Sequence, residues 1–492
     1  MISRKFITTS LIYTVSSTLS VLASFILLPF YTNTGLLKMG DYGALTLYIA
    51  LSLFVQVFAN FCLDFYVSVV YHDLKDQPEK LKAKMASLNG YVIVSGLIII
   101  ALFAIGGNFF IHAYIPNPNP SSFRYLMMSV VTGVFNAHFK FYNSLLINKE
   151  KPWRFFWSNM LNFVSTIVLS VIILKMFPLT LEGPLWGRLL SGLCIFAWSF
   201  IDVTVTYGVA LKKEFLKSTF QFCLPLLIST VFTWILTSSY GYVIKSLLYN
   251  EEVAIFDLAV KFTLLINFVL DGLGSAITPR IYSLMRQEQT VAVQKEINKY
   301  YSSFNLLALL IVPVNILILP IVVPIFISSD KYLQAFLYFG IVGAGVITRS
   351  LQILFVNPAY FYKQTPKLVW ANGISAVLQV VVSYVLIQKF KLYGAAFSLN
   401  IVKVLQLLLL LWFCGQFITP GINSRKMVML PMLSILIISI GEMFITGYDM
   451  RMHIIHAIEM VIIAILSWGF YKAELKDLWD WAKEKFPFLQ FG

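Results

Sequence analysis

Long apolar runs follow one another along the whole chain, and only short polar segments separate them. Clear examples lie at residues 91–114, 306–327 and 401–418. A helix needs about 20 mostly apolar residues to cross roughly 30 Å of hydrocarbon. The pattern therefore predicts about fourteen transmembrane helices, near residues 6–31, 42–66, 87–113, 122–146, 154–177, 185–208, 219–247, 254–279, 300–327, 334–360, 368–388, 394–417, 428–447 and 453–471.

The connections between these predicted helices are short. The longest lie near 67–86 and 280–299, and both carry charged residues. The first apolar run follows Arg4 and Lys5, but it is longer than the roughly 7–15 residues of a signal-peptide core, and no clear cleavage site follows it. We expect an uncleaved first helix. The sequence thus predicts an all-α polytopic membrane protein with no sizeable soluble domain.

An internal repeat underlies the pattern. KEKPWRFFWSN (149–159) resembles KQTPKLVWAN (363–372), and LSVIILKMF (169–177) resembles SYVLIQKF (383–390). Each half then has a helix that begins with glycine, at Gly183 or Gly394. A weaker similarity links 40–50 with 251–261. The offset of about 213 residues spans six predicted helices, and an even number gives both halves the same orientation in the membrane.

The repeat predicts four regions. They are an N-terminal six-helix lobe (1–210), a C-terminal six-helix lobe parallel to it (211–420), two extra transmembrane helices (421–472) and a C-terminal segment (473–492). One helical stripe of the last segment is apolar, formed by Leu475, Leu478, Trp479, Ala482 and Phe486. We expect an interfacial amphipathic helix there, on the cytoplasmic leaflet.

Composition shows what must cover the surface. The chain is 59% hydrophobic and only 12% charged, whereas soluble domains are about 25% charged, so lipid must cover much of this one. The cysteines all lie in separate apolar stretches, at Cys62, Cys194, Cys223 and Cys414. This placement favours packing over disulfides or metal ligands, and we expect no metal site.

The basic residues predict the orientation. Cytoplasmic loops carry an excess of lysine and arginine. With the N-terminus inside, 24 such residues fall in cytoplasmic segments, against 5 in the opposite loops (Lys38, Lys331, Lys389, Lys391 and Arg451). Both termini are therefore expected in the cytoplasm. The net charge of +14 reflects this topology, and we expect no nucleic-acid partner.

Charges inside the predicted helices are the candidate functional residues. Each costs about 2.5–3.5 kcal/mol at the bilayer centre and should face a partner or a hydrated cavity. The bases in or near helices are Arg124, Lys140, Lys175, Arg188, Lys245, Lys261, Arg349 and Lys403. Four of them lie near helix ends, where snorkelling explains them. Lys140, Lys261, Arg349 and Lys403 have no such explanation.

Several of these bases share a helix face with other polar residues. Asp257, Lys261 and Asp271 lie on one face, where Asp257 and Lys261 are spaced for an ion pair and Asp271 needs a partner elsewhere. Similar stripes combine Lys140 with Asn136 and Asn143, Arg349 with Gln352, and Lys403 with Asn400 and Gln406. One stripe alone could be an interhelical contact. Their recurrence in both lobes favours a hydrated basic cavity.

The acids within the predicted span could bind H⁺ or Na⁺, or each could be the buried partner of a base. They are Asp64, Asp202, Asp257, Asp271, Glu442 and Glu459. Glu442 and Glu459 lie in the two extra helices, and we assign them no role. His138 is a lone intramembrane histidine, which we expect to be a hydrogen-bonded packing residue.

The middle of the chain resembles a known family. Residues 220–285 resemble the seventh and eighth helices of Wzx-type polysaccharide flippases, which belong to the multidrug/oligosaccharidyl-lipid/polysaccharide exporter superfamily. The shared features are Pro225, the run to Trp234, IFDLAVK (255–261) and Pro279-Arg280 before a basic loop. The first two helices with GDYGALTLY (40–48), and the lobe repeat, are similar to the same family. The family often has Asp-Arg where this chain has Tyr240-Gly241, so a role of that pair is not carried over.

The resemblance implies a flippase in the bacterial inner membrane. Its cargo would be a polyprenyl-diphosphate-linked oligosaccharide for surface polysaccharide assembly, moved by alternating access through a basic cavity between the lobes. Cations suit a diphosphate, which points to Lys140, Lys261, Arg349, Arg188 and Lys403 as cargo contacts. Asp64, Asp257 and Asp271 are the candidates for coupling to H⁺ or Na⁺. No catalytic residue or cofactor is expected. The implied partners are the lipid-linked glycan and membrane lipids, with a glycan polymerase or export machinery left open.

Three alternatives remain. A multidrug exporter of the same superfamily would need an acidic cavity for cationic drugs, whereas the charges here are mainly basic. A peptidoglycan-precursor flippase is closer in chemistry, and the sequence separates it poorly. A membrane glycosyltransferase or polymerase usually presents acids or histidines on a large outer loop. Here the outer loops are short, and the histidines form no cluster in the sequence (His72, His112, His138, His453 and His456).

Overall fold

The computed structural model describes residues 4–114, 121–288, 290–417, 423, 425–472 and 474–476. Within these ranges the regular structure is helical, without strands, as the hydropathy pattern predicts. The chain forms two compact units, Met1–Ala254 with Ile327–Ser329, and Ile255–Phe326 with Asp330–Gly492. The two lobes predicted from the repeat meet at 210/211. That boundary comes from sequence similarity and not from compactness, so the lobes stay a prediction.

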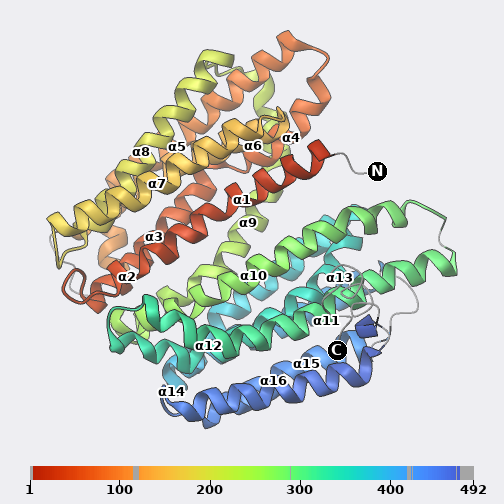
Figure 1. Cartoon of the computed structure of the whole chain (residues 1–492). Coiled ribbons are helices and arrows are strands. Elements are labelled where there is room, and N and C mark those ends of the chain that lie inside the picture. The colour runs from red at the N-terminus through yellow and green to blue at the C-terminus, as the bar shows by residue number, and fades with distance from the viewer. Residues whose placement is uncertain are drawn as a thin grey trace. The chain divides into compact units, whose positions relative to one another are not determined.

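The first unit contains nine helices in its described residues, together with the start of α10. They are α1 (Arg4–Ile26), α2 (Leu28–Tyr31), α3 (Met39–Asn60), α4 (Leu63–Leu74), α5 (Pro78–Tyr114), α6 (Ser122–Asn148), α7 (Pro152–Met176), α8 (Glu182–Tyr207) and α9 (Lys213–Leu247). The helix α6 packs against α3, α5 and α8, and α7 packs against α1 and α8, as Figure 1 shows for the long helices of this unit.

The second unit holds most of α10 and the elements that follow it. They are α10 (Asn250–Met285), α11 (Val291–Val322), η1 (Val323–Phe326), η2 (Asp330–Ala335), α12 (Phe336–Ala344), η3 (Gly345–Ile347), α13 (Thr348–Phe361), α14 (Thr365–Cys414), η4 (Gly415–Phe417), η5 (Arg425–Met429), α15 (Leu430–Gly441), η6 (Glu442–Phe444) and α16 (Met450–Phe470). Here α11 packs against α16, and α12 packs against α14 and α15.

Eleven helical segments among the described residues are long and apolar enough to cross a membrane. One of them, Thr365–Phe417, contains two of the predicted spans, because α14 breaks at Lys391 (φ 50°). Two further predicted spans correspond to α1 and α6, which are helical but are not among the eleven. The structure is thus consistent with about fourteen spans.

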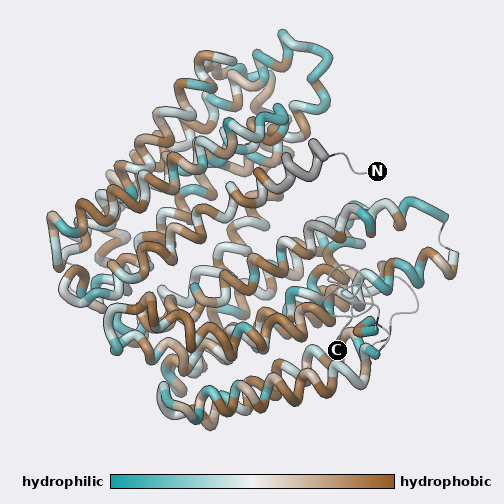
Figure 2. The backbone as a smooth tube through the Cα atoms, viewed as in Figure 1, coloured by the Kyte–Doolittle hydropathy of each residue, from teal (hydrophilic) through white to brown (hydrophobic). Residues whose placement is uncertain are grey.

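Apolar side chains cover much of the outer surface of the helices. Ile105, Val205 and Trp412 are each more than three-quarters exposed, a condition that water would penalise and lipid would not. Figure 2 shows hydrophobic residues along the helix lengths and hydrophilic ones mostly near their ends and connections. The exposed surface is therefore a lipid-facing surface, as the composition predicts.

Several helices depart from the predicted boundaries. The predicted helix 42–66 is interrupted at Phe61 and Cys62, where φ is 50° and 56°, and the predicted helix 334–360 is broken by η3. The predicted loop 280–299 is mostly helical, because α10 continues to Met285 and α11 begins at Val291. In that region the hydrogen bond from Arg280 to Glu296 (2.8 Å) raises the pKa of the arginine. Apolar periodicity marks the membrane-spanning part of a helix and misses its polar extension.

The predicted repeat has a matching internal geometry in each unit. A Cβ atom at Gly183 would lie 2.5 Å from Leu174 Cα, and one at Gly394 would lie 2.1 Å from Leu386 O. One turn further on, a Cβ atom at Gly187 would lie 2.4 Å from Ser170 Cα. At the corresponding place in the other unit, the hydroxyls of Ser383 and Ser398 are 2.9 Å apart. Small residues at these points allow two helices to approach closely.

The predicted amphipathic helix at 473–492 lies outside the described residues except for 474–476. In this remnant Glu474 forms an ion pair with Lys426. Just before it, the phenol of Tyr471 accepts a hydrogen bond from Asn305 (2.7 Å). These contacts attach the chain after α16 to α11 and η5. The amphipathic helix itself stays a prediction.

Candidate transport site

The break between α3 and α4 positions the first candidate acid. Phe61 and Cys62 take left-handed backbone conformations, which cost roughly 1–3 kcal/mol each outside glycine. Neighbouring helices compensate: Asn60 donates to Ala137 O (3.0 Å), Ser95 donates to Ala59 O (2.5 Å), and the Cys62 thiol lies 3.4 Å from Thr230 Oγ1. The Ala59 carbonyl is thereby hydrogen-bonded to α5, and the side chains of Asn60 and Cys62 contact α6 and α9.

Asp64 follows this break and meets Lys140 of α6. The Asp64 Oδ2 to Lys140 Nζ distance is 3.1 Å, and the two side chains are 10% and 40% exposed. Ser144, one turn after Lys140, donates to the Asp64 carbonyl at 2.5 Å. The second carboxylate oxygen of Asp64 is buried without a hydrogen-bond partner among the described residues. The Asp64 carboxylate is therefore largely buried, whereas the Lys140 side chain remains accessible.

The second unit pairs Asp271 of α10 with Arg349 of α13. Arg349 Nε and Nη2 each lie 2.8 Å from Asp271 Oδ1, and Arg349 Nη1 donates to Gln352 (3.3 Å). The polar chain continues because Gln352 donates to Gln406 (3.1 Å) and Gln406 donates to Asn372 (2.8 Å). A partner for Asp271 is what the sequence required. The structure identifies it as Arg349.

The pair of Asp271 and Arg349 is accessible. Their side chains are 49% and 44% exposed, although both residues lie on helices of the predicted membrane span. Charged groups at membrane depth do not face hydrocarbon when a hydrated surface is available. The second unit has two pairs that join a predicted coupling acid to a predicted cargo-binding base. The pair of Asp271 and Arg349 is the more exposed of the two.

The pair of Asp257 and Lys261 is of a different kind. It forms within α10 at the predicted spacing, with 2.6 Å between Oδ2 and Nζ, and its side chains are only 7% and 21% exposed. The predicted ion pair is confirmed. Its burial and its position on one helix fit the structural interpretation, and the functional interpretation that the sequence left open beside it stays a prediction.

Arg188 and Lys403 have no carboxylate partner among the described residues, and both are half-buried. Lys403 lies beside the break at η3, where a Cβ atom at Gly345 would fall 3.1 Å from Lys403 Nζ and 2.2 Å from Asn400 Oδ1. Asn400 itself donates to Ile341 O (2.6 Å). Gly345 thus leaves room for two polar side chains of α14 at the point where α12 ends.

Every acid that the sequence marked for ion coupling is thus in contact with a base that it marked for cargo binding. The pairs are Asp64–Lys140, Asp257–Lys261 and Asp271–Arg349. His138 is confirmed as a packing residue, because its two ring nitrogens lie 2.8 Å from Ser199 Oγ and 3.0 Å from Asn89 Oδ1. The pairing across helices is invisible in one sequence, since no local spacing encodes it.

Lys84 is a residue that the sequence reasoning missed. Its position in the charged connection near 67–86 predicts a loop lysine, yet on α5 it is only 5% exposed. Its ammonium lies 3.1 Å from Ser218 Oγ and over the rings of Tyr66 and Phe215, at 5.0 and 4.5 Å from their centroids. Cation–π contact of this kind stabilises a desolvated lysine. Nothing in the sequence around Lys84 distinguishes it from the exposed lysines of the same segment.

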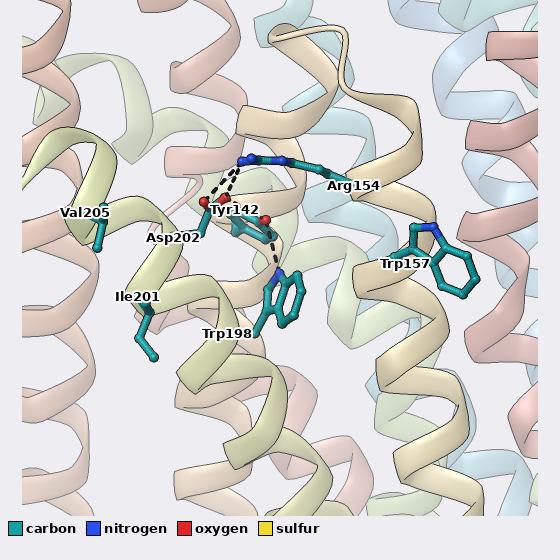
Figure 3. Close-up of a pocket in the computed structure, with 7 residues that line it drawn as sticks. All are labelled: Tyr142, Arg154, Trp157, Trp198, Ile201, Asp202 and Val205. Atoms are coloured by element: carbon teal, nitrogen blue, oxygen red, sulfur yellow. Dashed lines mark hydrogen bonds and ion pairs between the residues drawn. The ribbon is translucent and has the colours of Figure 1, made fainter.

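A surface hollow of about 550 Å³ lies on the first unit, between α6, α7 and α8. Arg154 pairs with Asp202 (3.2 Å), whose other oxygen accepts a hydrogen bond from Tyr142 (2.9 Å), and Trp198 donates to the same phenol (3.3 Å). Figure 3 shows this ladder, with Trp157 on the neighbouring helix. Trp157 and its repeat counterpart Trp370 are 60% and 67% exposed. Exposed tryptophans at matching places are typical of an interfacial aromatic belt, so we assign the hollow to lipid.

Together these features define a multi-pass helical membrane transporter, in which paired charges occupy apolar spans. The sequence profile of the polysaccharide biosynthesis protein family matches residues 7–285, more than half of the chain. The chain belongs to this family, which confirms the resemblance to polysaccharide flippases that its middle residues indicate. No curated protein is similar enough in sequence to count as a relative.

Solved structures share the fold. The lipid II flippase MurJ in an inward closed conformation has a TM-score of 0.68 and 14% identity, over 94% of this chain and 99% of that one. An inward-facing multidrug resistance MATE family transporter has a TM-score of 0.66 and 15% identity, over 81% and 94%. The Vibrio cholerae MATE transporter VcmN in its bent form has a TM-score of 0.52 and 14% identity, over 84% and 96%. At such identities the likeness shows the fold alone.

Proposed function

We propose that this flippase-type transporter moves a polyprenyl-diphosphate-linked oligosaccharide across the bacterial cytoplasmic membrane by alternating access. Membership of the polysaccharide biosynthesis protein family carries the proposal. Five basic residues within or near the spans support an anionic cargo, namely Lys140, Arg188, Lys261, Arg349 and Lys403. A diphosphate suits both the planar fork of arginine and the point charge of lysine.

The contacts between acids and bases support a specific coupling step. In the resting pair, Asp271 neutralises Arg349 and Asp64 neutralises Lys140. When the diphosphate approaches, it competes with the carboxylate for the same cation. The released carboxylate then needs a new counter-charge, which H⁺ or Na⁺ can supply. Cargo binding and ion binding are linked because they share one partner. Asp64, Asp257 and Asp271 are the acids in this step, and Asp271 is the most exposed of the three.

The excess of basic residues in one set of loops supports an N-in, C-in orientation in the inner membrane. In this orientation the cytoplasmic leaflet supplies the cargo, and its glycan leaves on the opposite side. Lipid-linked glycan and bulk lipid are the partners that the proposal requires. A glycan polymerase or export machinery would act after release.

A peptidoglycan-precursor flippase is the second candidate. The likeness to the lipid II flippase MurJ over 94% of this chain favours it. Both cargoes share the polyprenyl diphosphate, so the paired cations fit either one. The glycan therefore has to distinguish them.

The test is transport by the full-length protein in liposomes. Purified protein is reconstituted with a fluorescent polyprenyl-diphosphate oligosaccharide or a fluorescent peptidoglycan precursor, and a membrane-impermeant quencher reports the outer leaflet. We expect the oligosaccharide to flip at least ten times faster than the peptidoglycan precursor. Faster flipping of the precursor would establish the second candidate. Efflux of a cationic dye, with neither lipid moved, would establish a drug exporter.

The residue roles are tested in cells that depend on this protein for surface polysaccharide. Lys261→Gln and Arg349→Gln should abolish glycan export while the protein remains in the membrane at normal abundance. Lys331→Gln serves as the matched control, because Lys331 lies outside the predicted spans in a short 3-10 segment. Normal export by both Lys261→Gln and Arg349→Gln would overturn the assignment of cargo contacts.

A further inference from the structure

A cluster of three ionisable side chains lies buried in the last two helices, away from the paired charges described above. Glu442 follows α15, while His456 and Glu459 lie one turn apart on α16. Their exposed fractions are 0%, 1% and 4%. The sequence gave the two glutamates no role and left the histidine unclustered. The fold brings all three together because the short connection at 445–449 turns the chain back on itself.

The three side chains present ligand atoms to one another. Glu442 Oε1 and His456 Nε2 are 2.8 Å apart, and one ligand atom from each residue lies within 4.8 Å of the others. Both oxygens of Glu459 are buried without a hydrogen-bond partner among the described residues, as are Glu442 Oε2 and His456 Nδ1. A buried carboxylate without partners costs several kcal/mol, on the order of a full desolvation penalty. The cluster is thus incomplete as it stands.

Two glycines create the space that the carboxylates occupy. A Cβ atom at Gly340 of α12 would lie 1.5 Å from Glu442 Oε1, and one at Gly441 would lie 1.8 Å from Glu459 Oε1. Any larger residue at either position would displace a carboxylate. The close packing of α12, α15 and α16 therefore depends on glycine at these two positions, which leave the space that the two carboxylates fill.

The charge of the cluster and the types of its ligand atoms indicate which class of ion it could bind. The ion pair with His456 is the only one that Glu442 forms among the described residues, and Glu459 forms none there. When both carboxylates are ionised they carry a charge of −2, and a divalent cation would then make the buried cluster neutral. Hard cations such as Ca²⁺ and Mg²⁺ take oxygen ligands, whereas an imidazole nitrogen beside carboxylates suits Zn²⁺ and its transition-metal neighbours.

We propose that Glu442, His456 and Glu459 bind a divalent transition-metal ion of the Zn²⁺ class. Small side-chain rotations bring the three ligand atoms to coordination distance, and a second carboxylate oxygen of Glu459 can complete the set. The ion joins η6 to α16 and fixes both helices against α12. Its role is structural, and it is independent of the cargo proposed above.

The test is metal binding by the full-length protein in detergent. Protein stripped with a chelator is titrated with Zn²⁺ by calorimetry, and the metal retained after desalting is counted. We expect one ion per chain in the wild type and in His453→Gln, a matched control one turn away on the same helix. Affinity should fall at least 100-fold in Glu442→Gln, His456→Gln and Glu459→Gln. X-ray absorption of the wild-type protein should show nitrogen and oxygen donors without sulfur, which excludes the four cysteines.

Thermal unfolding is a second readout, because the Tm of each protein is compared with and without Zn²⁺. Zn²⁺ should raise the Tm of the wild type and of His453→Gln and leave Glu459→Gln unchanged. Glutamine is isosteric with glutamate and removes the buried charge, so this variant should fold at least as well as the metal-free wild type. Failure of the wild type to retain Zn²⁺, or equal retention by a Glu442→Gln/Glu459→Gln double variant, would overturn the site. Protons would then be the neutralising ligand.

Discussion

Arg349 donates a hydrogen bond through Nε to Asp271 Oδ1 at 2.8 Å, and its Nη2 lies at the same distance from that oxygen in an ion pair. This contact ties α13 to α10 across a separation of 78 residues. Both side chains remain nearly half exposed. An exposed ion pair stabilises a protein by only about 0–1 kcal/mol. Stability alone therefore accounts for little of this contact, and the transport role proposed for the pair can be tested separately.

Exchange of the two charges distinguishes these roles. In the double variant Arg349→Asp/Asp271→Arg the ion pair can re-form, so the Tm should stay within a few degrees of the wild type. Transport should nevertheless fall at least tenfold, because the cation no longer projects from α13. Flipping in liposomes and thermal unfolding in detergent measure the two quantities. Wild-type transport by the exchanged variant would show that the pair is only structural.

The pair of Asp64 and Lys140 should behave differently, because Asp64 is nearly buried. Lys140→Met leaves its carboxylate without the counter-charge, and we expect a loss of up to about 3 kcal/mol, below the value for fully buried pairs since Lys140 is partly exposed. The double variant Lys140→Met/Asp64→Asn should regain most of that stability without regaining transport. Thermal unfolding of the single and double variants forms the comparison. Equal destabilisation in both would contradict the pairing.

The helix break after Asn60 is predicted to matter for folding and transport. Asn60 is 1% exposed, donates to Ala137 O and accepts from the Asp64 N–H at 3.4 Å, so Asn60→Ala removes both hydrogen bonds at a cost of about 1–3 kcal/mol. We expect a lower Tm and reduced flipping, because Asp64 follows the break. Asn315→Ala is the control, since among the described residues Asn315 donates only to Ile311 O on its own helix. A similar Tm loss in both variants would argue against a special role for the break.

The close crossing of α7 and α8 makes a steric prediction. Gly187→Val places its Cβ atom 2.4 Å from Ser170 Cα. Overpacking of this kind costs about 1–3 kcal/mol or more, so little folded protein should be recovered. Gly106→Val is the matched control in α5, where nothing lies within 4 Å of the added atom. Size-exclusion profiles of the two variants give the answer, and equal profiles would contradict the close approach.

The orientation proposed from the basic residues can be checked with introduced cysteines. In a background in which the four native cysteines are replaced by alanine, Lys331→Cys should react with a membrane-impermeant reagent in intact cells. Lys295→Cys should react only after the membrane is opened. The reverse pattern would invert the topology, and with it the direction of cargo transfer.

The sequence by itself determined the class of protein, because lipid imposes length and apolar composition on every span. The helices, the break at Lys391, the i, i+4 pair of Asp257 and Lys261 and the packing role of His138 all follow from local pattern or from the cost of burying a polar group. The two halves also match internally, because their small residues recur at corresponding places.

Tertiary structure alone decided which charges meet. Asp271 meets Arg349, Asp64 meets Lys140, and Glu442 meets His456 and Glu459, because helices cross at points that periodicity does not encode. The breaks at Phe61 and Gly345 and the burial of Lys84 were equally hidden. A span looks the same in sequence whether its backbone is continuous or interrupted, since neighbouring helices supply the hydrogen bonds that an interruption needs.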